Sequence, residues 1–276
     1  TSAILDYKKK YPNLKVITRA HGSDLYEEKV NIFFRREAIK VIDGVFLISK
    51  NGFDYICKKY FFYKNKFYYS PLAIESKNIK SNQSSDNIFR IVSCSFIRPE
   101  KRLDFMANCI KELSFISKKK IEWFHIGGNV DLKEGDKLKS LKILTKHSQS
   151  NKVKFFFLGN MPNMDVLNFY KNQPLDLFLL LSSREGKPVS IIEALSVGLP
   201  IISTNVGGVS ELVDHNKNGI LVQTKDTSKK IAKTINLLIK NPNLLKLMRR
   251  ESLIKWKKGF NPKVNFRAFA KKIYTC

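Results

Sequence analysis

The stretch covering residues 175–208 constrains the fold of this chain more than any other part of it. It opens with an apolar run, residues 175–181, which predicts a buried strand of a parallel sheet. A short loop then leads to Pro188, which suits the first turn of a helix, and Gly198 predicts where that helix ends. A second strand begins at Ile201. Together these elements predict a right-handed crossover unit, and such units bind ligands at the carboxyl ends of their strands.

Two carboxylates fall within this unit. Glu185 lies in the predicted loop, and Glu193 follows eight residues later in the predicted helix. The backbone N–H groups near Gly186, Lys187 and Val189 are left without helical partners at the helix N-terminus, where the helix dipole favours an anion. The pattern therefore suits a ligand that is part phosphate and part sugar. The spacing alone is more typical of an ordinary helix with two solvated acids.

The rest of the chain predicts further alternation of strands and helices. Apolar runs that predict strands occur at residues 14–20, 44–49, 89–97, 122–128, 153–159 and 219–222. Segments with helical spacing lie between them, including residues 24–42, 98–116, 131–149, 226–240 and 242–258. Alternation of this kind predicts an α/β fold with parallel, doubly wound sheets.

The residues from Glu185 onward carry a family resemblance. They read EGKPVSIIE, then ALSVGLPIISTNVGGVSELV, then NGILV. This string closely resembles the donor-site signature of the retaining glycosyltransferases of family four, and the match runs from residue 182 to residue 222. The resemblance implies the GT-B fold, which has two Rossmann-like doubly wound domains. It also implies that the first of these domains is only partly present in this chain.

The resemblance assigns roles within the opening unit. Glu193 would hold the ribose hydroxyls of a nucleotide sugar. Glu185 would hold the transferred sugar and the diphosphate together with backbone groups of the following four residues, which are Gly186, Lys187, Pro188 and Val189.

A diphosphate lysine is implied further upstream. The segment PEK matches the family's pattern and makes Lys101 the residue that would neutralise the donor diphosphate. The family usually has an arginine five residues before this lysine, but Phe96 stands there. Arg98 is the candidate that would take over the role of that arginine.

Three further site residues follow from resemblance. His21 comes directly after the strand predicted at residues 14–20 and would contact the donor sugar. Asn160 and Met161 follow the strand at residues 153–159 and would line the base pocket. Each of the three positions also suits an ordinary turn or surface residue.

The domain boundaries follow from composition and resemblance. Residues 1–75 are expected to form the C-terminal part of the acceptor-side domain, and the polar run at residues 76–88 predicts a linker. Residues 89–250 are expected to form the donor-binding domain. Residues 251–276 resemble a terminal helix that crosses back to the first domain.

The charge balance bears on partners. The chain of 276 residues has 50 lysines and arginines against 24 acidic residues, a net charge of +26. Such a balance suits an anionic membrane surface or an anionic substrate, and a lysine-rich source organism would also explain it. The aromatic and basic segment at residues 60–71 allows a membrane contact as well, but no nucleic-acid signature accompanies the charge.

Cysteine usage indicates the compartment. The four cysteines show neither metal-ligand nor CxxC spacing, and no apolar run approaches the roughly 18 residues of a spanning helix. We therefore expect a cytoplasmic protein that can also lie peripherally on the inner face of the cytoplasmic membrane.

The function implied by resemblance is transfer of a sugar, with retention of anomeric configuration, from a UDP- or GDP-sugar. The acceptor would be a glycan or lipid-linked glycan in capsule, O-antigen, lipopolysaccharide or exopolysaccharide synthesis. No metal and no cofactor beyond the donor itself is expected, because Lys101 and the helix N-terminus already supply positive charge. Two alternatives stay open: a sugar-nucleotide epimerase with the same fold, and a truncated protein that binds the donor without turnover.

Overall fold

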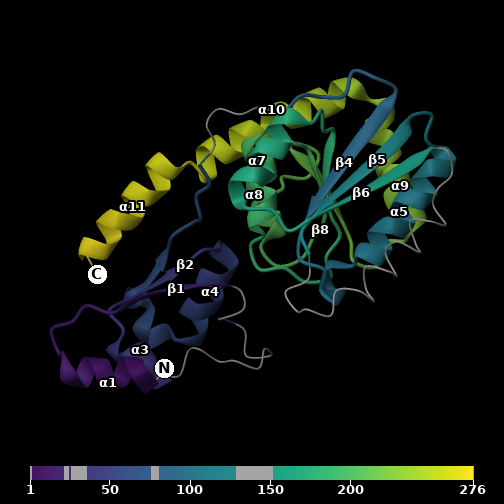
Figure 1. Cartoon of the computed structure of the whole chain (residues 1–276). Helices are drawn as coiled ribbons and strands as arrows, with labels where there is room; N and C mark the ends of the chain where they lie inside the picture. The colour runs from purple at the N-terminus through teal and green to yellow at the C-terminus, as the bar shows by residue number, and fades with distance from the viewer. Residues whose placement is uncertain (1, 22–24, 26–35, 76–80, 129–151, 276) are drawn as a thin grey trace. The chain divides into compact units, whose positions relative to one another are not determined.

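The computed structural model describes residues 2–21, 25, 36–75, 81–128 and 152–275, and these divide into two compact units (Figure 1). The first unit comprises residues 1–75, Glu185–Pro188 and Lys258–Cys276. The second comprises Ser76–Arg184 and Val189–Lys257. Each unit has its own parallel sheet and its own hydrophobic core.

The first unit is built on a small parallel sheet with strand order β1-β2-β3. Its strands are β1 (Ile17–Ala20), β2 (Gly44–Leu47) and β3 (Phe67–Tyr69). The helices are α1 (Ser2–Lys10), α3 (Arg36–Val41), α4 (Lys50–Lys59), the 3-10 helix η1 (Phe61–Lys66) and α11 (Pro262–Thr275). Every side chain of β2 is buried, as expected for a central parallel strand covered on both faces.

The terminal helix α11 belongs to the first unit. Phe269 packs edge-on against Phe46 of β2, with ring centroids 4.9 Å apart. Asn265 donates hydrogen bonds to the carbonyls of Leu72 and Gly259. The terminal helix was expected to start at residue 251, but that position lies inside α10 (Pro242–Gly259). Helix α10 ends at Gly259 and a new helix, α11, begins at Pro262. The two helices are not continuous because proline lacks the N–H that a continuing helix needs.

The second unit contains a six-stranded, fully parallel sheet with strand order β6-β5-β4-β7-β8-β9. Its strands are β4 (Ile88–Cys94), β5 (Lys120–Ile126), β6 (Val153–Gly159), β7 (Leu177–Leu180), β8 (Ile201–Thr204) and β9 (Gly219–Val222). Strands β4 to β6 progress toward one edge, and β7 to β9 progress toward the other. The strand order therefore reverses between β4 and β7, and in open α/β sheets ligands bind at this point.

Helices cover both faces of this sheet (Figure 1). One face carries α5 (Leu103–Ile116) and α9 (Ser228–Lys240), and the other carries α7 (Asn163–Asn172) and α8 (Val189–Ser196). Short 3-10 turns, η2 (Pro99–Lys101) and η3 (Val209–Glu211), follow β4 and β8.

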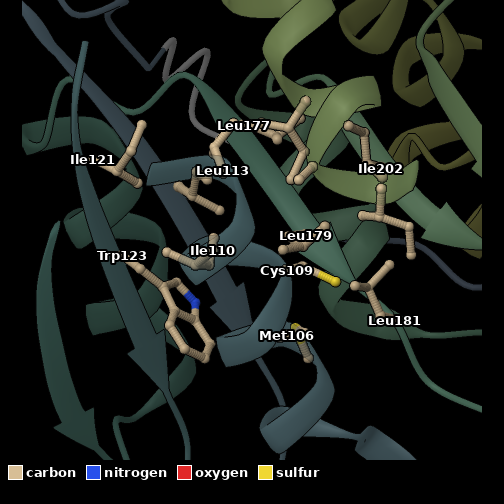
Figure 2. Close-up of a cluster of buried hydrophobic side chains, with 14 of the residues drawn as sticks. Met106, Cys109, Ile110, Leu113, Ile121, Trp123, Leu177, Leu179, Leu181 and Ile202 are labelled. Carbon is tan, nitrogen blue, oxygen red and sulfur yellow. The ribbon is translucent and has the colours of Figure 1, made fainter. Parts of the chain in front are cut away.

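The core beneath α5 is continuous across the sheet. Figure 2 shows side chains of α5 facing those of β5, β7 and β8. Trp123 is 1% exposed and packs against Phe155, with ring centroids 4.6 Å apart. The labelled members of this cluster are Met106, Cys109, Ile110, Leu113, Ile121, Trp123, Leu177, Leu179, Leu181 and Ile202. Burying a large apolar side chain contributes about 1.5–3 kcal/mol, so this face is a main source of stability.

The predicted end of helix α8 is confirmed at Gly198. This glycine has φ +81°, a left-handed conformation that terminates the helix. A Cβ at this position would lie 3.1 Å from the Leu253 side chain and 3.3 Å from the Arg249 carbonyl oxygen. Glycine therefore serves both the turn and the close approach of α10.

The predicted α/β class with parallel sheets is confirmed. Residues 60–71, expected to form a strand with turns, instead begin with η1, and only residues 67–69 form a strand. The helix predicted at residues 131–149 lies outside the described residues, as do most of the helix predicted at 24–42 and the start of the linker.

Candidate functional site

The site lies where the strand order of the six-stranded sheet reverses. Strand β4 ends at Cys94, and its neighbour β7 runs into the loop before α8. The 3-10 turn η2 follows β4 and carries Lys101. Helix α8 carries Glu193. Two residues of opposite charge are thus delivered by the two strands that flank the reversal.

Glu193 is a buried acid that accepts a hydrogen bond from a neighbouring side chain. Its residue is only 5% exposed, and the side-chain amide of Asn163 donates to its Oε1 atom. Burial raises the pKa of Glu193, and the Asn163 hydrogen bond opposes that rise. A buried carboxylate with a single donor retains acceptor capacity for a ligand, because each of its oxygens has two lone pairs.

Cys94 and Tyr170 lie beside this carboxylate. Burial raises the pKa of Cys94 to about 12, Glu193 adds to the rise, and the Tyr170 hydroxyl and Lys101 oppose it. The pKa of Tyr170 is also raised well above its usual value, first by burial and then by Cys94 and Glu193. Both groups therefore stay protonated near neutral pH. We call Glu193, Asn163, Cys94 and Tyr170 the glutamate cluster.

The backbone on both sides of Lys101 is held firmly. The Ser183 amide donates to the Glu100 carbonyl at 2.8 Å, which ties η2 to the loop after β7. Arg102 adopts a left-handed conformation with φ 51°, and its guanidinium donates to the Thr224 carbonyl at 3.2 Å. A non-glycine residue in this region is held there by its surroundings. These contacts fix the direction in which the chain presents Lys101.

The comparisons with known proteins identify the family. Residues 75–255, well over half of the chain, match the sequence model of the family described as Glycosyl transferases group 1. The chain belongs to this family.

Individual relatives agree with that assignment. The O-antigen biosynthesis glycosyltransferase WbnH of Escherichia coli is 33% identical over 138 residues, which cover 50% of this chain and 34% of the relative. An Escherichia coli protein named UDP-Gal:alpha-D-GlcNAc-diphosphoundecaprenol alpha-1,3-galactosyltransferase is 32% identical over 130 residues, which cover 46% of this chain and 32% of the relative. The chain thus spans about a third of the length of these curated relatives.

Solved structures show the fold. HepE from Anabaena, in complex with UDP and glucose, has a TM-score of 0.76 and 16% identity, with 100% of this chain and 76% of that chain covered. The lipopolysaccharide outer core galactosyltransferase WaaB, in its apo form, has a TM-score of 0.74 and 15% identity, with 99% and 73% covered. The predicted GT-B fold is confirmed.

The loop before α8 is divided between the two units of this group 1 glycosyltransferase. Glu185 and Gly186 are half-buried and belong to the first unit, whereas Val189 is exposed and begins α8 in the second. Lys187 and Pro188 are buried in the first unit, and the ammonium of Lys187 lies 5.2 Å from the centroid of the Phe260 ring and 5.7 Å from that of Tyr69. The side chain of Lys187 therefore lies near aromatic rings. These contacts do not test the role predicted for Lys187, which involves its backbone N–H group.

The other predicted residues lie at strand ends. Lys101, Arg98, Asn160 and Met161 belong to the second unit, and His21 follows β1 in the first. Arg98 is exposed, and its guanidinium lies 5.7 Å from the centroid of the exposed Phe96 ring. Asn160 is exposed and Met161 half-buried directly after β6. Their roles stay predictions.

Three residues of the glutamate cluster were not predicted as site residues. Asn163 is the first residue of α7, and its position after a strand end was its only sequence signal. Cys94 and Tyr170 read as apolar positions of a strand and a helix. Their place beside Glu193 depends on the pairing of β4 with β7, which is a long-range contact.

The described residues lack two further features. No helix among them is long and apolar enough to cross a membrane. No group of three or more histidine, cysteine, aspartate or glutamate side chains in those same ranges is placed to hold a metal ion.

Proposed function

We propose that this group 1 glycosyltransferase moves a sugar from a UDP- or GDP-sugar to a glycan or lipid-linked acceptor with retention of configuration. The observation that carries the proposal is the pairing of Lys101 after β4 with Glu193 after β7 at the reversal of strand order. The pKa of Cys94, at the end of β4, is affected by both charges, which supports placing them in one site. The acceptor class is suggested by what the named relatives act on.

In the proposed chemistry, each charged group serves a different part of the donor. The Glu193 carboxylate accepts hydrogen bonds from the ribose hydroxyls. The Lys101 ammonium and the N-terminus of α8 neutralise the diphosphate as it leaves, which is electrostatic stabilisation of charge that develops in the transition state. The acceptor hydroxyl attacks from the face that the diphosphate leaves and transfers its proton to the leaving phosphate. Glu185 and His21 contact the transferred sugar.

A peripheral membrane contact is part of the proposal. The first unit carries exposed aromatic side chains among lysines, and Phe62 is 90% exposed. The Lys64 ammonium lies 4.7 Å from the centroid of the Phe61 ring, and Phe61 is itself 59% exposed. Aromatic rings flanked by lysines suit the interface of an anionic bilayer. A lipid-linked acceptor would be met at that surface, on the cytoplasmic side.

Product analysis tests this function. The protein is incubated with UDP-glucose or GDP-mannose and a lipid-linked or free glycan, and the products are examined by nuclear magnetic resonance. The proposal predicts a new glycosidic bond whose anomeric configuration matches that of the donor. An isomerised nucleotide sugar would instead identify an epimerase. Donor binding without turnover, for every acceptor supplied, would identify a donor-binding protein without activity.

A further inference from the structure

The side chain of Asn163 connects the surface of α7 to the buried carboxylate of Glu193. Asn163 is exposed at the start of α7, yet its amide reaches the buried carboxylate and donates to Oε1. This hydrogen bond lowers the pKa of Glu193 and so opposes the rise that burial causes. An exposed amide thus covers a buried acid at the edge of the predicted site.

The other groups around Glu193 are neutral near pH 7. Cys94 faces it from β4 and Tyr170 from α7, and both remain protonated because their pKa values are raised. Among the described residues, Lys101 is a positive charge that lowers the pKa of Cys94. The Asn163 amide is therefore the group that directly offsets the burial of the Glu193 charge.

We propose that Asn163 is a positioning residue that holds the Glu193 carboxylate in one orientation, with Oε2 directed to accept hydrogen bonds from the donor ribose. A side-chain amide is suited to this task because its NH₂ group donates to a carboxylate and does not titrate. The inference rests on the proposed function, since it assumes that Glu193 binds the ribose.

The same contact has a consequence for pH. An ionised carboxylate accepts from both ribose hydroxyls, whereas a protonated one has lost part of that capacity. Donor affinity therefore falls as pH drops through the pKa of Glu193. Removing the Asn163 amide takes away a hydrogen bond to the ionised form, so the fall moves to higher pH.

The test measures the affinity of the better-binding of UDP-glucose and GDP-mannose between about pH 5 and pH 8 by calorimetry. These donors suit the purpose because their diphosphate keeps the same charge over that range. The variants are Asn163→Ala and Asn163→Gln, and the matched control is Asn168→Ala, an exposed asparagine of the same helix.

We expect Asn163→Ala to bind about 10-fold more weakly at neutral pH, as for the loss of a hydrogen bond to a charged group. We also expect its affinity to begin falling at a higher pH than in the wild type. Asn163→Gln keeps an amide and should recover part of both effects, and Asn168→Ala should match the wild type.

Two outcomes overturn the inference alone. One is wild-type affinity and pH dependence in Asn163→Ala. The other is a loss that is equal at every pH and accompanied by a lower melting temperature, which indicates a merely structural role. If the wild type binds neither nucleotide sugar at any pH, the proposed function fails and the inference fails with it.

Discussion

The six-stranded sheet carries two buried polar clusters that differ in what completes their hydrogen bonding. On the α5 face, Ser93 lies 2.8 Å from Nδ1 of His125 and accepts from the Trp123 indole at 2.9 Å. We call these three residues the histidine cluster. All three are at most 1% exposed, and Nε2 of His125 has no hydrogen-bond partner among the described residues. In the glutamate cluster, by contrast, the buried acid is held by an exposed amide and keeps acceptor capacity to spare.

The two clusters also differ in how burial changes the pKa of their ionisable residue. Burial lowers the pKa of His125 to about 4, although its interaction with the Ser95 backbone opposes this, so the imidazole stays neutral at pH 7. Burial raises the pKa of Glu193, which lies on α8, the helix that follows β7 at the reversal of strand order. The comparison teaches that burial alone does not indicate function. What distinguishes the glutamate cluster is that the exposed amide of Asn163 donates to its buried acid.

The largest effect is expected at Lys101. Lys101→Met removes the charge proposed to stabilise the leaving diphosphate, and kcat should fall about 10²- to 10³-fold. Lys101 is half-buried, so the melting temperature should change little. Steady-state kinetics and thermal denaturation measure the two quantities, with Lys229→Met on α9 as the control for loss of a lysine. An unchanged kcat would show that Lys101 does not stabilise the leaving diphosphate.

The histidine cluster should control stability in acid and leave activity alone. Below about pH 6.5 the unfolded chain binds a proton that folded His125 binds only near pH 4. The free energy of unfolding therefore decreases as the pH falls from about 6.5 to about 4, by about 3 kcal/mol in total. Urea denaturation of the wild type and His125→Gln at pH 7 and pH 5 should show a flatter pH dependence in the variant. If stability depended on pH equally in both proteins, burial would not lower the pKa of His125 in the folded state.

The glutamate cluster should show the opposite pattern. Glu193→Gln loses hydrogen bonds from ribose hydroxyls to a charged group, so the Kd for the donor should rise about 10- to 150-fold. Because the pKa of Glu193 is raised in the folded state, its charge costs stability once the pH exceeds the unfolded value. The variant should therefore be as stable as the wild type at pH 7, or more stable. Calorimetry and thermal denaturation check both, with Glu112→Gln on α5 as the control.

A pure stability effect without any effect on binding is expected at Gly198. Gly198→Ala forces an alanine into a left-handed conformation and against Leu253, at a cost of about 1–2 kcal/mol. Donor affinity should stay at the wild-type value because the residue follows the C-terminus of α8. If affinity fell together with stability, the geometry of the α8 N-terminus would depend on the far end of that helix.

Much of the fold could be predicted because its signals are local. The apolar run at residues 175–181 and Gly198 fixed the elements of the central crossover unit without reference to the rest of the chain. The helix predicted at residues 242–258 is confirmed by α10, and only the boundary placed at residue 251 was wrong. The helical pattern continues through residue 251, and the terminal helix starts at Pro262.

The candidate site could be predicted only in part. Glu193 and Lys101 belong to recognisable motifs, and both lie where the strand order reverses. The residues that complete the environment of Glu193 could not be found this way. Cys94 and Tyr170 have ordinary buried patterns, and Asn163 is 30 residues from its partner. Their proximity follows from the pairing of β4 with β7, which no local pattern encodes.

The central claim is that Glu193 binds the ribose of a nucleotide sugar at the reversal of strand order. The most direct test compares the affinities of UDP, or GDP if it binds better, with those of its 2′-deoxy and 3′-deoxy forms, for the wild type and Glu193→Gln. We predict that the wild type loses about 10-fold or more in affinity for the deoxy forms, whereas Glu193→Gln discriminates far less. Equal discrimination by both proteins would contradict the claim.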